Sequence, residues 1–153
     1  MRIKQYVYFG IFSEQVPAVD VTARLRVEPD EVRVRGSRSV QPVRPVAHSW
    51  HVRCDEAGLT VDDQIERVVG RLEPVAGEIG ALVAELAAAG SGAAVLQVVR
   101  HFGHSSGEED DGGVVDGAER FAGQHQLLGW HLDPRVVDFL VRTHAELNVD
   151  EYG

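Results

Sequence analysis

The run IKQYVYFGIF at residues 3–12 constrains the fold more than any other segment of the chain. After Tyr6 it is apolar at both alternating sets of positions, which is the pattern of a strand with both faces at least partly covered. We therefore predict a central strand of a sheet. The run follows a basic start, but it is short and has no small-residue cleavage site, so it lacks the form of a signal peptide.

Residues 47–54 predict a strand of a different kind. Their alternating positions form an apolar and a polar set, Trp50, Val52 and Cys54 against Ser49, His51 and Arg53. This period of two is typical of a half-buried strand. We expect Trp50 to anchor the core, and His51 and Arg53 to face away from it on an exposed surface.

Three further segments have strand character. Residues 30–45 alternate valine and arginine before breaking into Gly, Ser and Pro, which favours an edge strand or an exposed arm. Residues 93–102 are apolar on both faces, and residues 125–132 are expected to return as another strand.

Helix signals fill the gaps between these strands. Pro17 fits the first turn of a short helix that ends before Pro29. Thr60 caps a long helical segment, which Pro74 interrupts and which ends at Gly90 or Gly92. Asp133 caps the last helix, with Pro134 at its first position. We expect this helix to bury Val136, Val137, Leu140, Val141 and Leu147.

The order of these segments predicts an α+β fold with a mostly antiparallel sheet and helices on one face. We expect a ferredoxin-like core with an extra C-terminal strand and helix. One face of such a sheet is open to solvent or to a partner. A chain of 153 residues has the size of one domain, so residues 1–153 are assigned to one, with a flexible acidic Gly-rich loop at residues 103–124.

Landmarks are spaced along nearly the whole chain: Pro17, VTARLRVEP at 21–29, Gly36, SWHV at 49–52, LDPRVVDFL at 132–140 and LNVDEY at 147–152. Together they resemble an uncharacterised bacterial family, the domain of unknown function 4279. The chain departs from the pattern in its long 103–124 insertion and at Arg26, where glycine is commoner. The resemblance supports the fold, and it carries no active site that could be transferred to this chain.

Charge is distributed unevenly along the chain. Residues 1–53 carry nine Lys/Arg against five Asp/Glu, whereas residues 54–153 carry six against nineteen, which gives +4 and −13 within the net charge of −9. The acidic part opposes nucleic-acid binding. No run approaches the ~20 apolar residues that span a bilayer, so we expect no membrane. Cys54 is the single cysteine, which excludes an intrachain disulfide and favours a cytoplasmic location.

His101 and His104, beside the acidic run at residues 108–111, suggest a metal site. Zinc accepts histidine nitrogens and carboxylate oxygens, and an open coordination position would permit hydrolysis. The spacing is not the helical pair of a metalloprotease, and a solvated loop explains the same residues. We expect no cofactor.

His51, Arg53 and His131 are the second candidate set, since they could converge on the open face of the sheet and bind a ligand or a partner. The ordinary polar exterior of a sheet is the alternative. We assign no catalytic residue: Cys54 alternates with core positions, and no nucleophile elbow or phosphate loop occurs.

Together these features predict a small binding protein without catalysis, whose partner is another protein. An immunity-type or accessory role in bacterial conflict suits a small acidic domain, because charge complementarity selects partners. A homo-oligomer is compatible with the sequence. The alternative is a metal- or small-ligand-binding protein, or an enzyme, that uses the open sheet face.

Overall fold

The computed structural model describes residues 2–103 and 129–153. In chain order the elements are β1 (Arg2–Ser13), α1 (Ala18–Leu25), β2 (Glu31–Arg33), β3 (Ser39–Val40), β4 (Val43–Arg44), β5 (His48–Cys54), α2 (Val61–Leu72), η1 (Glu73–Val75), α3 (Ala76–Ala88), β6 (Gly92–Gly103), α5 (Pro134–Thr143) and β7 (Glu146–Tyr152). The fold is α+β, as the sequence predicts.

Five strands form one sheet in the order β2-β5-β1-β6-β7. β1 lies in its centre, which confirms the prediction from residues 3–12. β1 pairs antiparallel with β5 and β6, and β2 pairs antiparallel with β5. β7 instead runs parallel to β6, so the sheet is mixed, whereas the sequence predicted a mostly antiparallel one. The physical reason is that α5 precedes β7 on the helix side, and a crossover of this kind returns a strand in the parallel direction.

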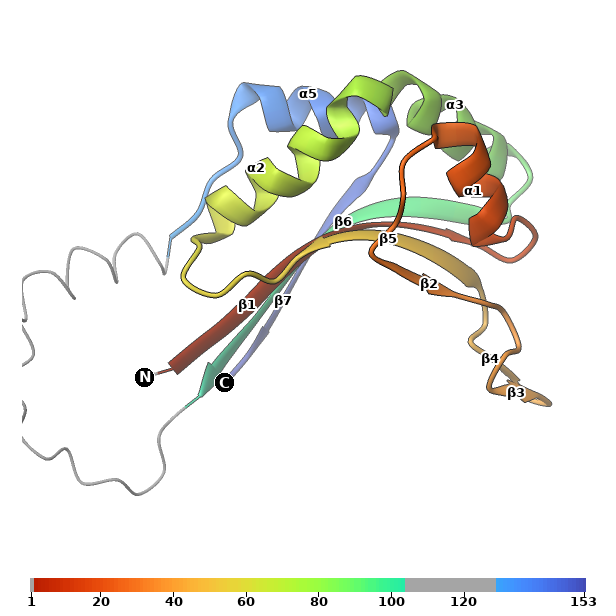
Figure 1. Ribbon diagram of the computed structural model, residues 1–153, viewed down its shortest axis with the longest axis horizontal. Helices are drawn as coiled ribbons and strands as arrows, with labels where there is room; N and C mark the ends of the chain where they lie inside the picture. The colour runs from red at the N-terminus through yellow and green to blue at the C-terminus, as the bar shows by residue number, and fades with distance from the viewer. Residues whose placement is uncertain (1, 104–128) are drawn as a thin grey trace, which may run out of the picture.

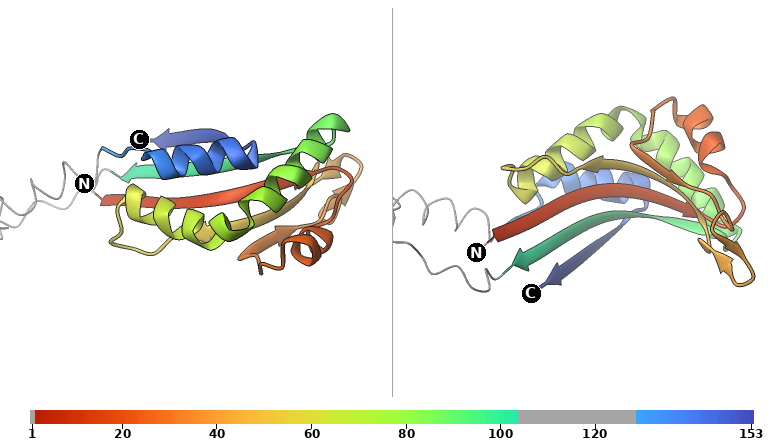
Figure 2. Two further views of the ribbon diagram at one scale, coloured as in Figure 1. Left: turned by 90° about the horizontal axis from the view of Figure 1, so that it is seen from above. Right: turned by 60° about the horizontal axis from the view of Figure 1, so that its bottom comes forward.

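The helices of the described residues all lie on one side of the sheet, and the sheet arches beneath them (Figure 1). Seen from above, α2, α3 and α5 lie across β1, β5 and β6, while α1 sits at the end near β2 (Figure 2). With the underside turned forward, no helix from residues 2–103 or 129–153 lies in front of the strands (Figure 2). We call this side of the sheet the hollow face.

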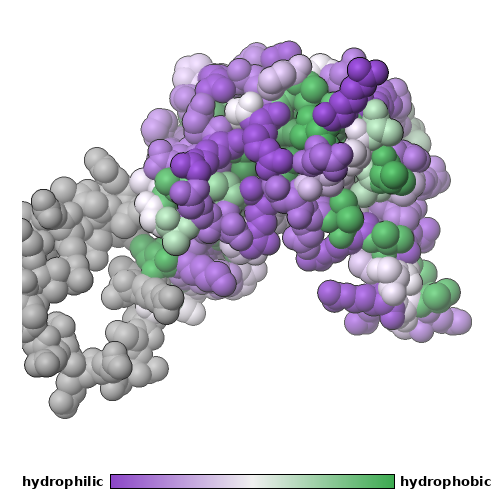
Figure 3. All heavy atoms as spheres, viewed as in Figure 1, coloured by the Kyte–Doolittle hydropathy of each residue, from purple (hydrophilic) through white to green (hydrophobic). Residues whose placement is uncertain are grey.

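β3 and β4 form a separate two-stranded hairpin that projects from the end of the sheet beside β2 (Figure 1). It belongs to the segment predicted as an edge strand or an exposed arm. Both descriptions hold, because β2 is the edge strand and the hairpin is the arm. Hydrophobic side chains reach the surface there (Figure 3), and Val40 and Val46 are among the most exposed.

The core lies between the sheet and the helices. Trp50 is fully buried, and its indole Nε1–H donates to the Thr22 hydroxyl of α1 at 3.0 Å. Phe9 of β1 meets Phe139 of α5 edge to face, with ring centroids 5.5 Å apart. The predicted core position of Trp50 is therefore confirmed.

Local helix signals were also predicted correctly. The Thr60 hydroxyl accepts from the Asp63 amide, and the Asp63 carboxylate accepts from the Thr60 amide in return, which forms a capping box. Pro74 lies in the 3-10 turn η1, which separates α2 from α3. The Asp133 carboxylate caps α5 by accepting from the Val136 amide at 2.9 Å. No helix among the described residues is long and apolar enough to cross a membrane.

The C-terminal prediction was wrong in its order of elements, because the last helix ends at Thr143 and a strand follows it. His144 adopts a left-handed backbone with φ of 55°, which reverses the chain into β7. Leu147 therefore lies on a strand instead of on the helix stripe. Val137 and Val141 are exposed, and the buried stripe of α5 is Val136, Phe139 and Thr143.

Two predictions concern residues near the described boundary. Residues 129–132 are irregular instead of strand-like, and the rest of the strand predicted at 125–132 lies outside the described residues. Of the predicted loop at 103–124, Gly103 ends β6 and the remainder also lies outside them.

Trp50→Ala should lower the free energy of unfolding by ~3 to 5 kcal/mol, because it removes a fully buried ring and leaves a cavity. Urea unfolding followed by far-UV circular dichroism measures this loss. A loss below about 1 kcal/mol would contradict the placement of the ring in the core.

Gly80 is required where α3 meets α5. A β-carbon at this position would lie 2.1 Å from the Arg142 carbonyl oxygen, so Gly80→Ala should destabilise the protein by roughly 1 to 3 kcal/mol. Gly77→Ala is a matched control on the same helix, since nothing lies within 4 Å of its β-carbon position. The control should stabilise by up to about 1 kcal/mol. If thermal unfolding showed the same change in stability for Gly80→Ala and Gly77→Ala, the two helices would not approach closely.

Candidate binding face of the sheet

The strand register shows which side chains line the hollow face. Positions opposite one another in neighbouring strands point to the same side, and His51 lies opposite Gly10 and Glu31. Val7 and Phe9 of β1 and Trp50 and Val52 of β5 belong to the hydrophobic core under the helices. The residues that alternate with them along each strand therefore face away from the helices. The face is thus lined by Tyr6, Tyr8, Gly10 and Phe12 of β1, Ser49, His51 and Arg53 of β5, Val95, Gln97 and Val99 of β6, and Glu146, Asn148 and Asp150 of β7.

Aromatic side chains pack on one another in the middle of this face. The His51 ring stacks on Tyr8 with centroids 4.5 Å apart, and Phe12 meets it edge-on at 5.3 Å. Gly10 makes room for this cluster, because a β-carbon there would lie 2.8 Å from the Phe12 ring and 3.2 Å from His51. Within the described part of the chain, the rings of this face are therefore buried by one another and not by a helix.

His51 was predicted to be exposed, and this is wrong: only 4% of the residue is accessible. The prediction of its side of the strand is correct, but Tyr8 and Phe12 cover it. Burial lowers the pKa of His51 from its ordinary value near 6.5 to about 4, against the opposing effect of Glu31. The side chain is therefore neutral near pH 7. Its buried Nε2 makes no hydrogen bond within the described part of the chain.

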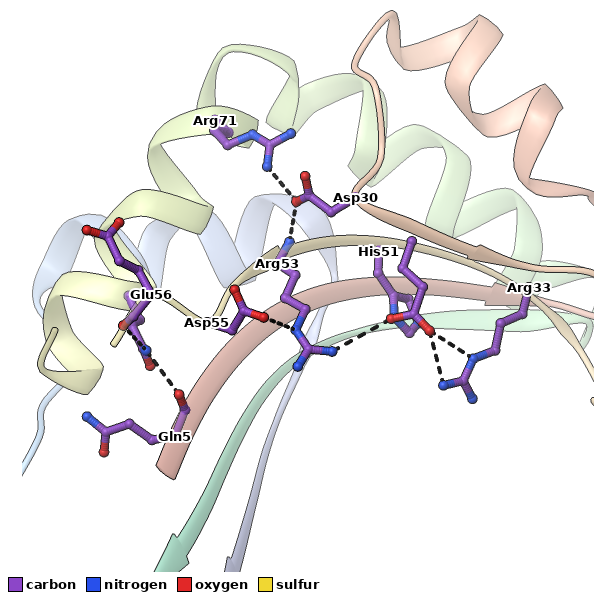
Figure 4. Close-up of polar contacts among 10 residues, drawn as sticks. Gln5, Asp30, Arg33, His51, Arg53, Asp55, Glu56 and Arg71 are labelled. Atoms are coloured by element: carbon purple, nitrogen blue, oxygen red, sulfur yellow. Dashed lines mark hydrogen bonds and ion pairs between the residues drawn. The ribbon is translucent and has the colours of Figure 1, made fainter. Parts of the chain in front are cut away.

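Arg53 occupies the margin of the face next to β2. Its guanidinium lies over the Tyr6 ring at 4.2 Å and within 3.7 Å of Glu31 and 3.5 Å of Asp55. Figure 4 shows Arg53 with Asp55 on one side and His51 on the other. The opposed contacts hold Arg53 in one orientation.

Asp30 fixes the same region from the helix side. Its carboxylate accepts from the Arg53 amide at 2.7 Å and from the Arg71 guanidinium at 2.6 Å (Figure 4). An open pocket of about 420 Å³ lies here, lined by Asp30, Glu31, Arg53 and Asp55. Three carboxylates and one guanidinium give this pocket an acidic lining.

β7 forms the opposite margin and is tied to β6 by side chains on both faces. Gln97 donates to Asp150 at 2.9 Å on the hollow face, and Arg100 donates to Glu151 at 3.0 Å on the helix side. Arg100 is only 2% exposed. Sequence reasoning missed this margin, because nothing near residue 100 shows that its partner lies in the C-terminal strand.

The structure does not bring the third candidate, His131, to His51 and Arg53. His131 lies on the helix side, 77% exposed, where its amide and its Nδ1 approach the Asp62 carboxylate at the start of α2. Of the metal candidates, His101 stacks on Tyr152 at 4.8 Å, and His104 lies outside the described residues. Across residues 2–103 and 129–153, no group of three or more His, Cys, Asp or Glu could hold a metal ion.

The hollow face combines aromatic, basic and acidic groups. Its groups are aromatic rings, an ion-paired guanidinium, carboxylates and a neutral imidazole. Cys54 is instead buried with the core. Rings and arginine supply contact area and directed hydrogen bonds.

Comparison with known proteins identifies one family. The family described as domain of unknown function (DUF4279) matches residues 2–153, nearly the whole chain. No curated protein and no solved structure matches the chain.

The buried imidazole should make stability depend on pH. Between about pH 6.5 and pH 4 the unfolded chain binds a proton at His51 that the folded protein does not, so folding weakens as the pH falls. Below about pH 4 both states are protonated and the difference is constant. Between neutral pH and about pH 4.5, the free energy of unfolding of the native protein should fall on the order of 2 to 3 kcal/mol more than that of His51→Phe. Urea unfolding at both pH values measures this, and equal losses would contradict a neutral, buried His51.

Proposed function

The chain belongs to the DUF4279 family, and we propose that it is a binding protein whose hollow face receives another protein, without chemistry of its own. The observation that carries the proposal is the aromatic centre of this face, where Tyr6, Tyr8 and Phe12 stay half-buried although no described helix covers them. Tyrosine and arginine are the residues on which interfaces depend most.

The rigidity of the face supports the same conclusion. His51 is clamped between Tyr8 and Phe12, and Arg53 is held by two carboxylates and a ring. Side chains that are already fixed lose little freedom when a partner docks, so less of the contact energy is spent on ordering them.

Charge favours a basic partner. The chain carries −9 overall, and a charge of this size raises the rate at which an oppositely charged protein is captured. An immunity-type or accessory protein of the bacterial cytoplasm, which masks the basic surface of its partner, fits this charge. The single cysteine supports the compartment.

We infer that the first four strands of the sheet form a ferredoxin-like core. The order β6-β1-β5-β2 and the antiparallel pairing of each neighbouring pair support this inference. So do the two connections on the helix side, through α1 and through α2 with α3. In this scheme α5 and β7 are the C-terminal addition.

A small cationic ligand is the second candidate. The pocket beside Arg53 favours it, because its three carboxylates outnumber its one guanidinium. A ligand there would compete with Arg53 for Glu31 and Asp55.

The binding proposal predicts that Tyr6→Ala combined with Arg53→Ala abolishes capture of a basic protein from the lysate of the source cells. The identified protein is then purified and titrated calorimetrically against both forms. The double variant should bind at least about tenfold more weakly, since interface anchors contribute about 2 kcal/mol or more.

Arg67→Ala combined with Arg135→Ala is the matched control, because these arginines lie in exposed ion pairs with Glu56, Glu66 and Glu73. It should bind like the native protein. The proposal is wrong if both double variants bind the purified partner equally, or if the captured ligand is a small cation that saturates the pocket.

A further inference from the structure

We propose that the outer edge of β7 accepts an extended basic segment of a partner protein as an additional strand of the sheet. The inference rests on the proposed function in taking the partner to be a protein, but it concerns a surface separate from the aromatic centre of the hollow face.

The first observation is that β7 is the last strand of the sheet formed by residues 2–103 and 129–153. β6 pairs with one side of it from Glu146 to Tyr152, and no strand within the described residues pairs with the other side. All seven residues of the strand are exposed. Seven residues in a parallel strand span about 23 Å, which is enough for several backbone hydrogen bonds to an added strand.

The second observation is the charge of this edge. Residues 146–152 contain Glu146, Asp150 and Glu151 and no basic residue. Asp150 and Glu151 are held by Gln97 and Arg100, so the strand presents its carboxylates from a fixed backbone. Opposite charges directly across a strand pair stabilise it, and like charges destabilise it. An added strand must therefore be basic, which disfavours a second β7 from another copy.

The third observation is the alternation along β7. Leu147 and Val149 point to the helix side and remain 37% and 40% exposed, while Glu146, Asn148 and Asp150 point to the hollow side. A matching strand alternates apolar residues, which would cover Leu147 and Val149, with basic residues that would face the carboxylates.

The opposite edge of the sheet does not offer the same site. β2 has only three residues, Glu31 and Arg33 already pair with each other, and the following Arg35 bonds to the Val46 carbonyl. Short edges with engaged charges resist strand addition. The long, acidic and half-apolar edge is the one at β7.

The test uses a fluorescent synthetic peptide of alternating valine and arginine, and a second peptide of equal composition with its arginines contiguous. Fluorescence polarisation should show binding of the alternating peptide to the native protein, and weaker binding of the contiguous one. Hydrogen exchange should slow at backbone amides within residues 146–152 when the alternating peptide is added, because added-strand hydrogen bonds protect them.

Glu146→Lys should weaken binding of the alternating peptide by roughly tenfold, since it replaces an attractive cross-strand pair by a repulsive one. Glu78→Lys, with the same charge change in the first turn of α3, should leave the affinity unchanged. Equal weakening by both variants, equal affinity for both peptides, or exchange protection outside β7 would overturn the proposal. So would a concentration-dependent dimer in sedimentation that Glu146→Lys abolishes, because another copy would then occupy the edge.

The two proposals fail separately. Tyr6→Ala combined with Arg53→Ala should still bind the alternating peptide, because Tyr6 lies on β1 and Arg53 on β5, and β6 separates both strands from β7. Loss of peptide binding with Glu146→Lys alone supports the edge site, whatever the outcome of the partner titration. If the native protein binds its purified partner through the hollow face but does not bind the peptide, the edge site is refuted and the proposed function stands.

Discussion

The packing of every described helix on one side of the sheet is the constraint on which the remaining structure depends. It gives β1 a core face of Val7, Phe9 and Ile11, and leaves the opposite face to bury its own side chains. The arch of the sheet and the missing side chain of Gly10 let Tyr8 and Phe12 close over His51. Burial of the imidazole lowers its pKa more than the nearby Glu31 carboxylate raises it, so His51 stays neutral.

Features set by local sequence could be predicted. Trp50 alternates with Val52, Thr60 and Asp133 cap the helices that follow them, and Pro74 breaks a helix, so each signal lies within a few residues of its effect. The side of the strand on which His51 and Arg53 lie followed from the same period of two. For the candidate site, local pattern thus gave two of its residues and their face.

Features set by distant contacts could not be predicted. The burial of His51 depends on rings about forty residues earlier in the chain, a separation no local pattern encodes. His131 follows a segment with apolar alternation, yet it pairs with Asp62 on the helix side. β7 resembles a helix end in sequence, because no Gly or Asn marks the left-handed turn that His144 supplies. Arg100 stands at the end of an apolar run and pairs with Glu151, fifty-one residues later in the chain, which no local pattern indicates.

The same asymmetry links the fold to the two proposed contacts. In the described residues the sheet is covered on one side, which leaves one face and two edges exposed, and each needs a feature that prevents indiscriminate association. On the hollow face the carboxylates of Glu31 and Asp55 balance the positive charge of Arg53, so the aromatic centre of the face carries little net charge. The edge at β7 is acidic, which repels a second copy of itself and admits a basic strand. In the two proposals specificity therefore comes from different means on adjoining surfaces: ion pairs around Arg53 on the face, and an excess of acidic over basic residues on the edge.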